Sequence, residues 1–105
     1  MNKEEIQEIS FQIIGFAGDA FSSFFQAVTK AKEGKYGEAD MLLKAGEEQM
    51  VKAHQAQTEL LVTEANGDDM AYSVLLVHAQ DHLMTTIMYE RVAREFVSLY
   101  KERSK

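Results

Sequence analysis

The sequence contains no cysteine, no proline and no tryptophan. The absence of cysteine excludes disulfide bonds, thiolate catalysis and cysteine-based zinc sites. Because proline breaks helices, a chain without it is unusual for a fold of many loops and strands and natural for a few long helices. The sequence therefore favours a helical protein whose chemistry depends on other side chains.

Basic residues are also scarce, with 11 Lys and Arg against 17 Asp and Glu, which gives a formal net charge of −6. An acidic chain is a poor non-specific ligand for nucleic acid or anionic lipid, so neither is expected as a partner. No apolar run approaches the roughly 18 residues of a membrane-spanning helix, and residues 1–10 lack the apolar core of a signal peptide. We therefore expect a soluble, intracellular protein without direct membrane insertion.

Two glycine-containing breaks divide the 105 residues, a length that suits a single domain over 1–105. The breaks lie at Glu33–Gly37 and at Asn66–Asp69. Between them, apolar or small residues recur at alternating gaps of three and four, the period of one helical face. Short connections make neighbouring helices antiparallel, so we expect an all-α, up-down-up three-helix bundle. The helices are expected at about residues 3–33, 36–66 and 70–102.

Each helix has one face that the period assigns to the bundle core. In order along the chain, these faces are Ile6, Ile9, Ile13, Phe16, Ala20, Phe24, Ala27 and Ala31; then Ala39, Leu43, Gly46, Met50, Ala53, Gln57 and Leu60; then Leu75, His78, His82, Thr85, Tyr89, Val92, Phe96 and Leu99. Gly15, Gly18 and Gly46 fall inside helices, where glycine costs about 1 kcal/mol relative to alanine. Close helix approach is one explanation of these glycines, and tolerated imperfection is the other.

The third helix is too apolar for a helix that only two neighbours cover. Its N-terminal half is apolar or weakly polar around most of the circumference, and a helix of this kind is normally buried all round. A second stripe lies outside the assigned core face and contains Val74, Val77, Asp81, Met84 and Met88. We expect this stripe to meet other copies of the chain about a symmetry axis.

Polar residues interrupt the apolar run at His78-Ala79-Gln80-Asp81-His82. At about 100° per residue, His82 lies roughly +40° from His78 and Asp81 roughly −60°. His78 and His82 therefore share one face, one turn apart, while Asp81 can point into the second stripe. If copies of Asp81 meet at an axis, a hard cation such as Mg²⁺ suits their oxygen ligands. Shared protons or a bond to His78 are the metal-free alternatives.

Three roles remain open for the two histidines on spacing alone. The pattern His-x-x-Asp-His is similar to a zinc-hydrolase motif, but nothing distinctive follows His82 as a third ligand. A neutral imidazole can also accept a phosphoryl group and release it, with His78 as nucleophile and His82 as a hydrogen-bond donor to the phosphoryl oxygens. The third role is a satisfied polar layer that sets the register of a non-catalytic helical oligomer.

The string Val77-His78-Ala79-Gln80-Asp81-His82-Leu83-Met84-Thr85 closely resembles the third-helix motif of the lactose/cellobiose-type enzyme IIA of the bacterial sugar phosphotransferase system. Ala53-His54-Gln55-Ala56-Gln57-Thr58 is similar to that family's Ala-His-x-x-Gln-Thr segment, and Phe16-Ala17-Gly18-Asp19-Ala20 to its first-helix signature. The likeness runs from about Glu4 to Lys101, almost the whole chain.

The resemblance implies a cytoplasmic homotrimer of three-helix subunits, nine helices in all, that associates transiently with the membrane permease through enzyme IIB. His78 would accept a phosphoryl group from the histidine-containing phosphocarrier protein, with His82 in a supporting hydrogen bond. It would then pass the group to a cysteine of enzyme IIB, which phosphorylates a β-linked disaccharide of the lactose or cellobiose type. Asp81 from each subunit would hold one Mg²⁺ per trimer at the threefold axis.

The chain departs from the family pattern at Phe21. Family members often have a basic residue there, within Ala-Arg-Ser, where this chain has Ala20-Phe21-Ser22. The departure leaves open how the rim of the phosphoryl site is charged and which enzyme IIB fits it. Gln80 is expected in a mainly structural role, and His54 and Gln57 are expected to bond across helices.

Overall fold

The computed structural model describes residues 1–104, and over this range it consists of three α-helices and no strand. The helices are α1 (Lys3–Lys32), α2 (Tyr36–Ala65) and α3 (Val74–Arg103). The prediction of an all-helical chain with three long helices is confirmed. Lys105, the last residue of the expected single domain, lies outside the described residues.

The third helix begins at Val74, four residues after the expected start near residue 70. Ser73 has extended backbone angles, φ −151° and ψ 129°, and its side chain is buried. Met70 and Ala71, just before it, pack against the edge of the hydrophobic core. This segment contributes its side chains to the bundle in an extended conformation, so helical periodicity extrapolated backwards from α3 places the start too early.

Local sequence explains where α1 begins and where α1 and α2 end. Asn2 caps α1 in a reciprocal arrangement, in which its side chain accepts from the Glu5 amide and the Glu5 carboxylate accepts from the Asn2 amide. Gly34 and Gly67 follow the C-termini of α1 and α2 with φ of 81° and 87°. These positive angles favour glycine because a side chain would clash there.

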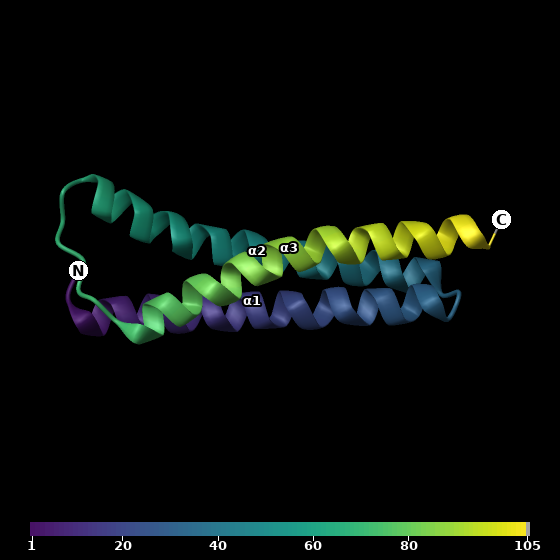
Figure 1. Cartoon of the computed structure of the whole chain (residues 1–105), viewed down its shortest axis with the longest axis horizontal. Coiled ribbons are helices and arrows are strands. Elements are labelled where there is room, and N and C mark those ends of the chain that lie inside the picture. The colour runs from purple at the N-terminus through teal and green to yellow at the C-terminus, as the bar shows by residue number, and fades with distance from the viewer. Residues whose placement is uncertain (105) are drawn as a thin grey trace.

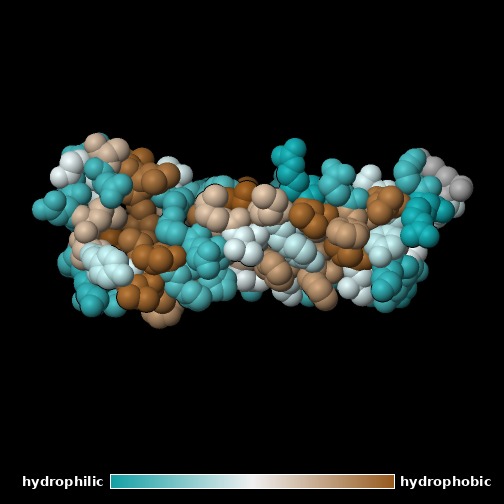
Figure 2. All heavy atoms as spheres, in the orientation of Figure 1, coloured by the Kyte–Doolittle hydropathy of each residue, from teal (hydrophilic) through white to brown (hydrophobic). Residues whose placement is uncertain are grey.

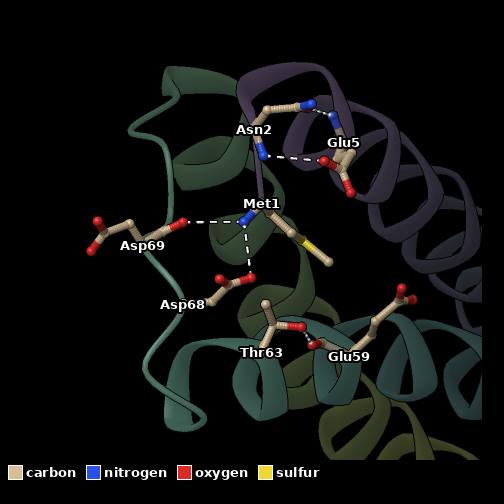
Figure 3. A network of polar contacts seen from close by, with 7 residues as sticks. All are labelled: Met1, Asn2, Glu5, Glu59, Thr63, Asp68 and Asp69. Atoms are coloured by element: carbon tan, nitrogen blue, oxygen red, sulfur yellow. Dashed lines mark hydrogen bonds and ion pairs between the residues drawn. The ribbon is translucent and has the colours of Figure 1, made fainter.

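The start of α1 is tied to the connection between α2 and α3. The ammonium group of Met1 donates to the Asp68 carboxylate at 3.2 Å and to the Asp69 carbonyl at 3.1 Å (Figure 3). At the opposite end, Lys101 near the end of α3 pairs with Asp40 near the start of α2 at 2.7 Å. Successive helices therefore run in opposite directions, along a rod of 55 × 19 × 17 Å (Figure 1).

The three helices do not pack equally. α1 packs extensively against both other helices, whereas α2 and α3 contact each other only slightly. They diverge at the end of the rod where the connection between them lies (Figure 1). The hydrophobic core is accordingly built around α1, and α2 and α3 lie on either side of it.

Alanine supplies half of the buried hydrophobic residues among those described: Ala17, Ala20, Ala27, Ala31, Ala39, Ala53, Ala56, Ala79 and Ala93. Small side chains let helix backbones approach closely. The closest approach involves Gly46 of α2, where an added Cβ would lie 2.4 Å from the ring of the fully buried Phe24 of α1. Close helix approach thus explains Gly46, but not Gly15 or Gly18, which have nothing within 4 Å of an added Cβ.

The predicted core face is nearly right for the first two helices and wrong for the third. In α1 Ala17 is buried where Phe16 was expected, and in α2 Ala56 is buried where Gln57 was expected. In α3 the buried residues are Ala79, Leu83, Thr86, Ala93 and Val97. That face is one residue further along than the predicted one, so His78 and His82 do not lie in the bundle core.

The seam between α2 and α3 is held mainly by polar side chains. Four polar contacts follow one another from the start of α2 towards the end of the rod where α2 and α3 diverge. The hydroxyl group of Tyr36 donates to the carbonyl of Tyr100, and Asp40 pairs with Lys101. Further along, Glu47 pairs with Arg94, and Gln57 bonds with Gln80. Exposed ion pairs each contribute little stability, typically below about 1 kcal/mol. The packing of both helices on α1 is therefore the main source of stability.

Many large hydrophobic side chains lie outside this alanine-rich core. The α3 stripe Val74, Val77, Met84 and Met88 is 56–71% exposed in the single chain. Hydrophobic side chains also gather where α2 and α3 diverge, around a hollow of about 230 Å³ that Leu60, Leu61, Met70 and Leu76 help to line (Figure 2). None of the helices in residues 1–104 combines the length and the apolar character that crossing a membrane requires.

Candidate functional site

His78 and His82 meet on the outer surface of α3. Their Nε2 atoms lie 3.0 Å apart, and their rings are nearly perpendicular, at 81° with centroids separated by 4.4 Å. The contact agrees with the four-residue spacing, which predicts two side chains on one face. His78 is exposed and His82 is half-buried, so solvent reaches both rings.

The short separation of the two nitrogens restricts where protons can be. One Nε2 must donate and the other must accept, so the pair holds one proton between the two Nε2 atoms. If His82 carries the Nε2 proton, the Nε2 of His78 is unprotonated and its lone pair accepts that hydrogen bond until a phosphorus atom replaces it. The pair can therefore offer one nucleophilic nitrogen next to one N–H donor.

Thr86 connects the helical turn of α3 that carries His82 to the hydrophobic core. Its hydroxyl group is buried and donates to the carbonyl of His82 at 2.8 Å, with the carbonyl of Ala17 in α1 at 3.5 Å. The bond to His82 lies within α3, while the contact with Ala17 reaches across to α1. The backbone beneath His82 is therefore fixed against α1, although the rings themselves face outward.

An apolar hollow of about 320 Å³ lies beside His82, lined by Gly18, Phe21, His82, Thr85 and Thr86. Phe21 stacks on Tyr89 with ring centroids 4.4 Å apart and an interplanar angle of 24°. Burial raises the pKa of the Tyr89 phenol above its ordinary value of 10.0. The rim at Phe21, whose charge the sequence left open, is thus aromatic.

Asp81 lies on a different side of α3 from the contact between the histidines. It lines a shallow hollow of about 460 Å³ together with Val74, Val77, His78, Gln80 and Met84. Its carboxylate is exposed and makes no hydrogen bond or ion pair with another residue in 1–104. The metal-free alternative of a bond to His78 is therefore not seen.

A single chain does not assemble a metal site from acidic, histidine or cysteine residues. Within residues 1–104, no three such side chains come together in a way that would hold an ion. The two histidines thus lack the third protein ligand that a zinc hydrolase needs. The Asp81 carboxylate fits Mg²⁺ as one hard oxygen donor, and a complete site would need further copies of it.

Gln80 lies between the two histidines in sequence but faces α2. Its side-chain amide exchanges two hydrogen bonds with that of Gln57, each 2.6 Å long. The expected cross-helix bond of Gln57 is confirmed, and the structural role of Gln80 stays a prediction that this bond supports. His54 is exposed and makes no hydrogen bond within the described chain, so the same expectation is wrong for His54.

Sequence reasoning missed the contribution of Thr86 and Gly18 to this region. Gly18 lines the hollow beside His82, and beyond its own stretch of helix backbone nothing lies within 4 Å of the position its Cβ would take. The available signal was the placement of an otherwise costly glycine in mid-helix and of a threonine four residues after His82. Neither signal reveals that the two positions are adjacent in space.

Comparison with known proteins adds independent information. The family model described as "PTS system, Lactose/Cellobiose specific IIA subunit" matches residues 8–101. The lactose-specific EIIA component of the PTS system from Staphylococcus aureus (strain N315) is 48% identical over 101 residues, which cover 96% of this chain and 98% of that protein.

Two solved structures extend the comparison to the fold. The PTS cellobiose-specific enzyme IIA from Bacillus anthracis has a TM-score of 0.92 at 42% identity, covering 99% of this chain and 94% of the other. A complex of IIA(chitobiose) with HPr, from the N,N'-diacetylchitobiose branch of the Escherichia coli phosphotransferase system, contains a chain with a TM-score of 0.82 at 29% identity. That match covers 95% of this chain and 97% of the other.

Proposed function

The chain belongs to the family of lactose/cellobiose-specific IIA subunits of the phosphotransferase system, and on this premise we propose that it carries a phosphoryl group on His78. One observation supports this residue above the other two histidines. The Nε2 of His78 is exposed and lies 3.0 Å from a second imidazole that can hold the proton, whereas His54 makes no hydrogen bond with another described residue.

The first step is a transfer between two imidazoles. The lone pair on Nε2 of neutral His78 attacks the phosphorus of the phosphohistidine in the histidine-containing phosphocarrier protein. A new N–P bond forms as the N–P bond of the donor breaks, and the bonding electrons return to the donor imidazole. The related IIA(chitobiose) in complex with HPr supports this choice of donor. No water is consumed, so catalysis depends on positioning and electrostatic stabilisation.

His82 acts as the supporting donor. In the tautomer with the proton on its Nε2, it holds the Nε2 of His78 unprotonated before transfer. When phosphorus approaches, this N–H turns to a phosphoryl oxygen, where negative charge is greatest. The bond from Thr86 to the His82 carbonyl keeps the turn in place. Charged hydrogen bonds of this kind contribute about 1.5–3 kcal/mol each.

The second step passes the group to enzyme IIB. A thiolate of its cysteine attacks the phosphorus, the S–P bond forms, and the N–P electrons return to His78. Enzyme IIB then phosphorylates a transported β-linked disaccharide of the lactose or cellobiose type. In this scheme the chain works in the cytoplasm and associates only transiently with the membrane permease, through enzyme IIB.

We further propose that the working form is a homotrimer with the α3 stripes packed at its axis. The exposed Val74, Val77, Met84 and Met88 support it, because large side chains are outside while alanine occupies the core. Three copies of Asp81 would then supply carboxylate oxygens to one Mg²⁺, which neutralises their mutual repulsion. The ion would stabilise the assembly and takes no part in the transfer.

The competing function is a non-catalytic oligomer in which buried histidines set the register. His78 is exposed and His82 half-buried in the single chain, which counts against that function. The deciding experiment incubates the protein with phosphorylated phosphocarrier protein and locates the label by mass spectrometry under alkaline conditions. We expect one phosphoryl group per chain, on His78, and none on the His78→Ala variant.

Two further variants separate chemistry from folding. His54→Ala should label like the wild type, because His54 is exposed and makes no hydrogen bond with either residue of the pair. His82→Ala should label His78 at least tenfold more slowly, as expected for loss of a hydrogen bond worth about 1.5–3 kcal/mol in the transition state. Full labelling of a correctly helical His78→Ala variant would refute the assignment.

A further inference from the structure

The His78–His82 pair has a geometry that suits a second kind of chemistry besides phosphoryl transfer. Both Nε2 atoms point at one another across 3.0 Å, on the outer face of a helix that continues for more than five turns beyond them. Two histidines four residues apart on one helical face can bind the same zinc ion, and the helix fixes their separation. The pair is therefore preorganised as two nitrogen ligands for one metal ion.

The distances fit this chemistry closely. With Zn–N bonds of about 2.0–2.1 Å, two ligands at the tetrahedral angle lie roughly 3.3–3.4 Å apart. The observed 3.0 Å needs an opening of only a few tenths of an ångström, which small rotations of the two rings can supply. Because His78 is exposed and His82 half-buried, water can reach the remaining coordination positions.

The type of ion follows from the ligands. Imidazole nitrogen suits zinc and its neighbours among the divalent transition metals, whereas Mg²⁺ prefers oxygen. No third acidic, histidine or cysteine ligand completes the site in residues 1–104. Two protein ligands give an open, exchangeable site, unlike the closed four-ligand sites of structural zinc.

We propose that His78 and His82 chelate one zinc-class transition-metal ion per chain through their Nε2 atoms, and that this ion and the phosphoryl group exclude one another. The second part depends on the proposed function. The Nε2 lone pair of His78 can bond either to the metal or to phosphorus. Zinc at the pair therefore prevents phosphorylation, and phosphorylated His78 can no longer act as a ligand.

The first part is tested by titrating untagged protein with Zn²⁺ in a calorimeter, with excess Mg²⁺ present to occupy sites made of oxygen ligands. We expect one Zn²⁺ per chain, and at least tenfold weaker binding in His78→Ala and in His82→Ala. His54→Ala is the matched control and should bind like the wild type. Weakening of less than tenfold in either pair variant, or of tenfold or more in His54→Ala, would overturn the site.

A measurement on the unmodified chain guards against variants that misfold. Long-range ¹H–¹⁵N spectra of the histidine rings report which nitrogen is bound to metal. Zinc should shift the Nε2 resonances of His78 and His82 together and leave those of His54 unchanged. A shift confined to Nδ1 atoms, or one that includes His54 equally, would contradict chelation between the two Nε2 atoms.

The second part is tested by labelling with phosphorylated phosphocarrier protein. At a free Zn²⁺ concentration ten times the measured Kd, the wild type should label about tenfold more slowly, because about one chain in eleven is metal-free. His82→Ala, labelled with the same donor, is the control for effects of zinc on the donor itself and should show less than a twofold further change.

Unchanged labelling of zinc-loaded wild type would overturn the exclusion. If instead no phosphoryl group reaches His78 even without zinc, the proposed function fails. The calorimetric and spectroscopic results on the metal site remain valid in that case, so the two failures are distinguishable.

Discussion

At the scale of single residues, Tyr89 combines a raised pKa with an aromatic stack, and a titration can follow the first without disturbing the second. Burial raises the pKa of its phenol above 10.0, and its ring stacks on Phe21 at the rim of the hollow beside His82. The folded protein therefore holds this proton more tightly than the unfolded chain does. This contribution to stability is present below pH 10 and is lost as the pH rises through the raised pKa.

We predict that absorbance of tyrosinate will show one ionisation above the ordinary tyrosine range, and that it disappears in Tyr89→Phe. The variant keeps the aromatic stack, so its helical content at neutral pH should equal that of the wild type. Its free energy of unfolding should also fall less steeply as the pH rises above 10. Persistence of the late ionisation in Tyr89→Phe would show that it comes from another residue.

The sequence predicted part of this site because that part is local. The spacing of four residues from His78 to His82 predicts their contact, and the angle to Asp81 predicts that it lies on another side of α3. The stack of Phe21 on Tyr89 and the approach of Thr86 to Ala17 could not be predicted. They depend on how far α1 is shifted along α3, which is set by the packing of the whole helices.

At the scale of helices, the approach of α1 to α2 depends on Gly46. A Cβ at this position would lie 2.4 Å from the fully buried Phe24 ring, which cannot swing into solvent. Gly46→Ala should therefore lower the free energy of unfolding by about 1–3 kcal/mol, despite the helix propensity gained. Chemical denaturation measures this change.

Gly37→Ala is the matched control for that substitution. Gly37 lies in α2 as well, but an added Cβ there has nothing within 4 Å. Its substitution should leave the stability unchanged or raise it by less than about 1 kcal/mol. Equal destabilisation by the two variants would mean that flexibility of the helix, not helix contact, explains the effect at Gly46.

The error in the predicted face of α3 has a physical origin. The period of three and four is present on more than one face of this helix, and the prediction chose the one with the larger side chains, including Tyr89, Val92, Phe96 and Leu99. The bundle instead buries Ala79 and Ala93, which let α3 approach α1 closely. Size and hydropathy identify surfaces that become buried, but not whether this chain or another buries them.

At the scale of the whole molecule, two substitutions in α3 test the proposed trimer and the Mg²⁺ site at its axis. Asp81→Leu should retain a mass three times that of the chain in light scattering, because leucine can fill an apolar axis, yet it should lose bound Mg²⁺ in elemental analysis. Met84→Glu, which places a charge among Val77 and Met88, should reduce the mass toward that of one chain.

Met41→Glu is the control, since Met41 is 72% exposed and lies beside Gln26 and Lys30, between α1 and α2. It should assemble like the wild type. A single-chain mass for the wild type at micromolar concentration would refute the trimer, and Mg²⁺ retained by Asp81→Leu would refute the axial site.

The central position of α1 also bears on how the protein is made. Of the three helices, α1, on which both others pack, is translated before α2 and α3. α2 emerges next and finds its packing surface already formed, and α3 arrives last and finds the other side of the same helix. Only α1 has to wait for its partners, whereas α2 and α3 each emerge after the helix they pack on and can bury their apolar faces as soon as they leave the exit tunnel.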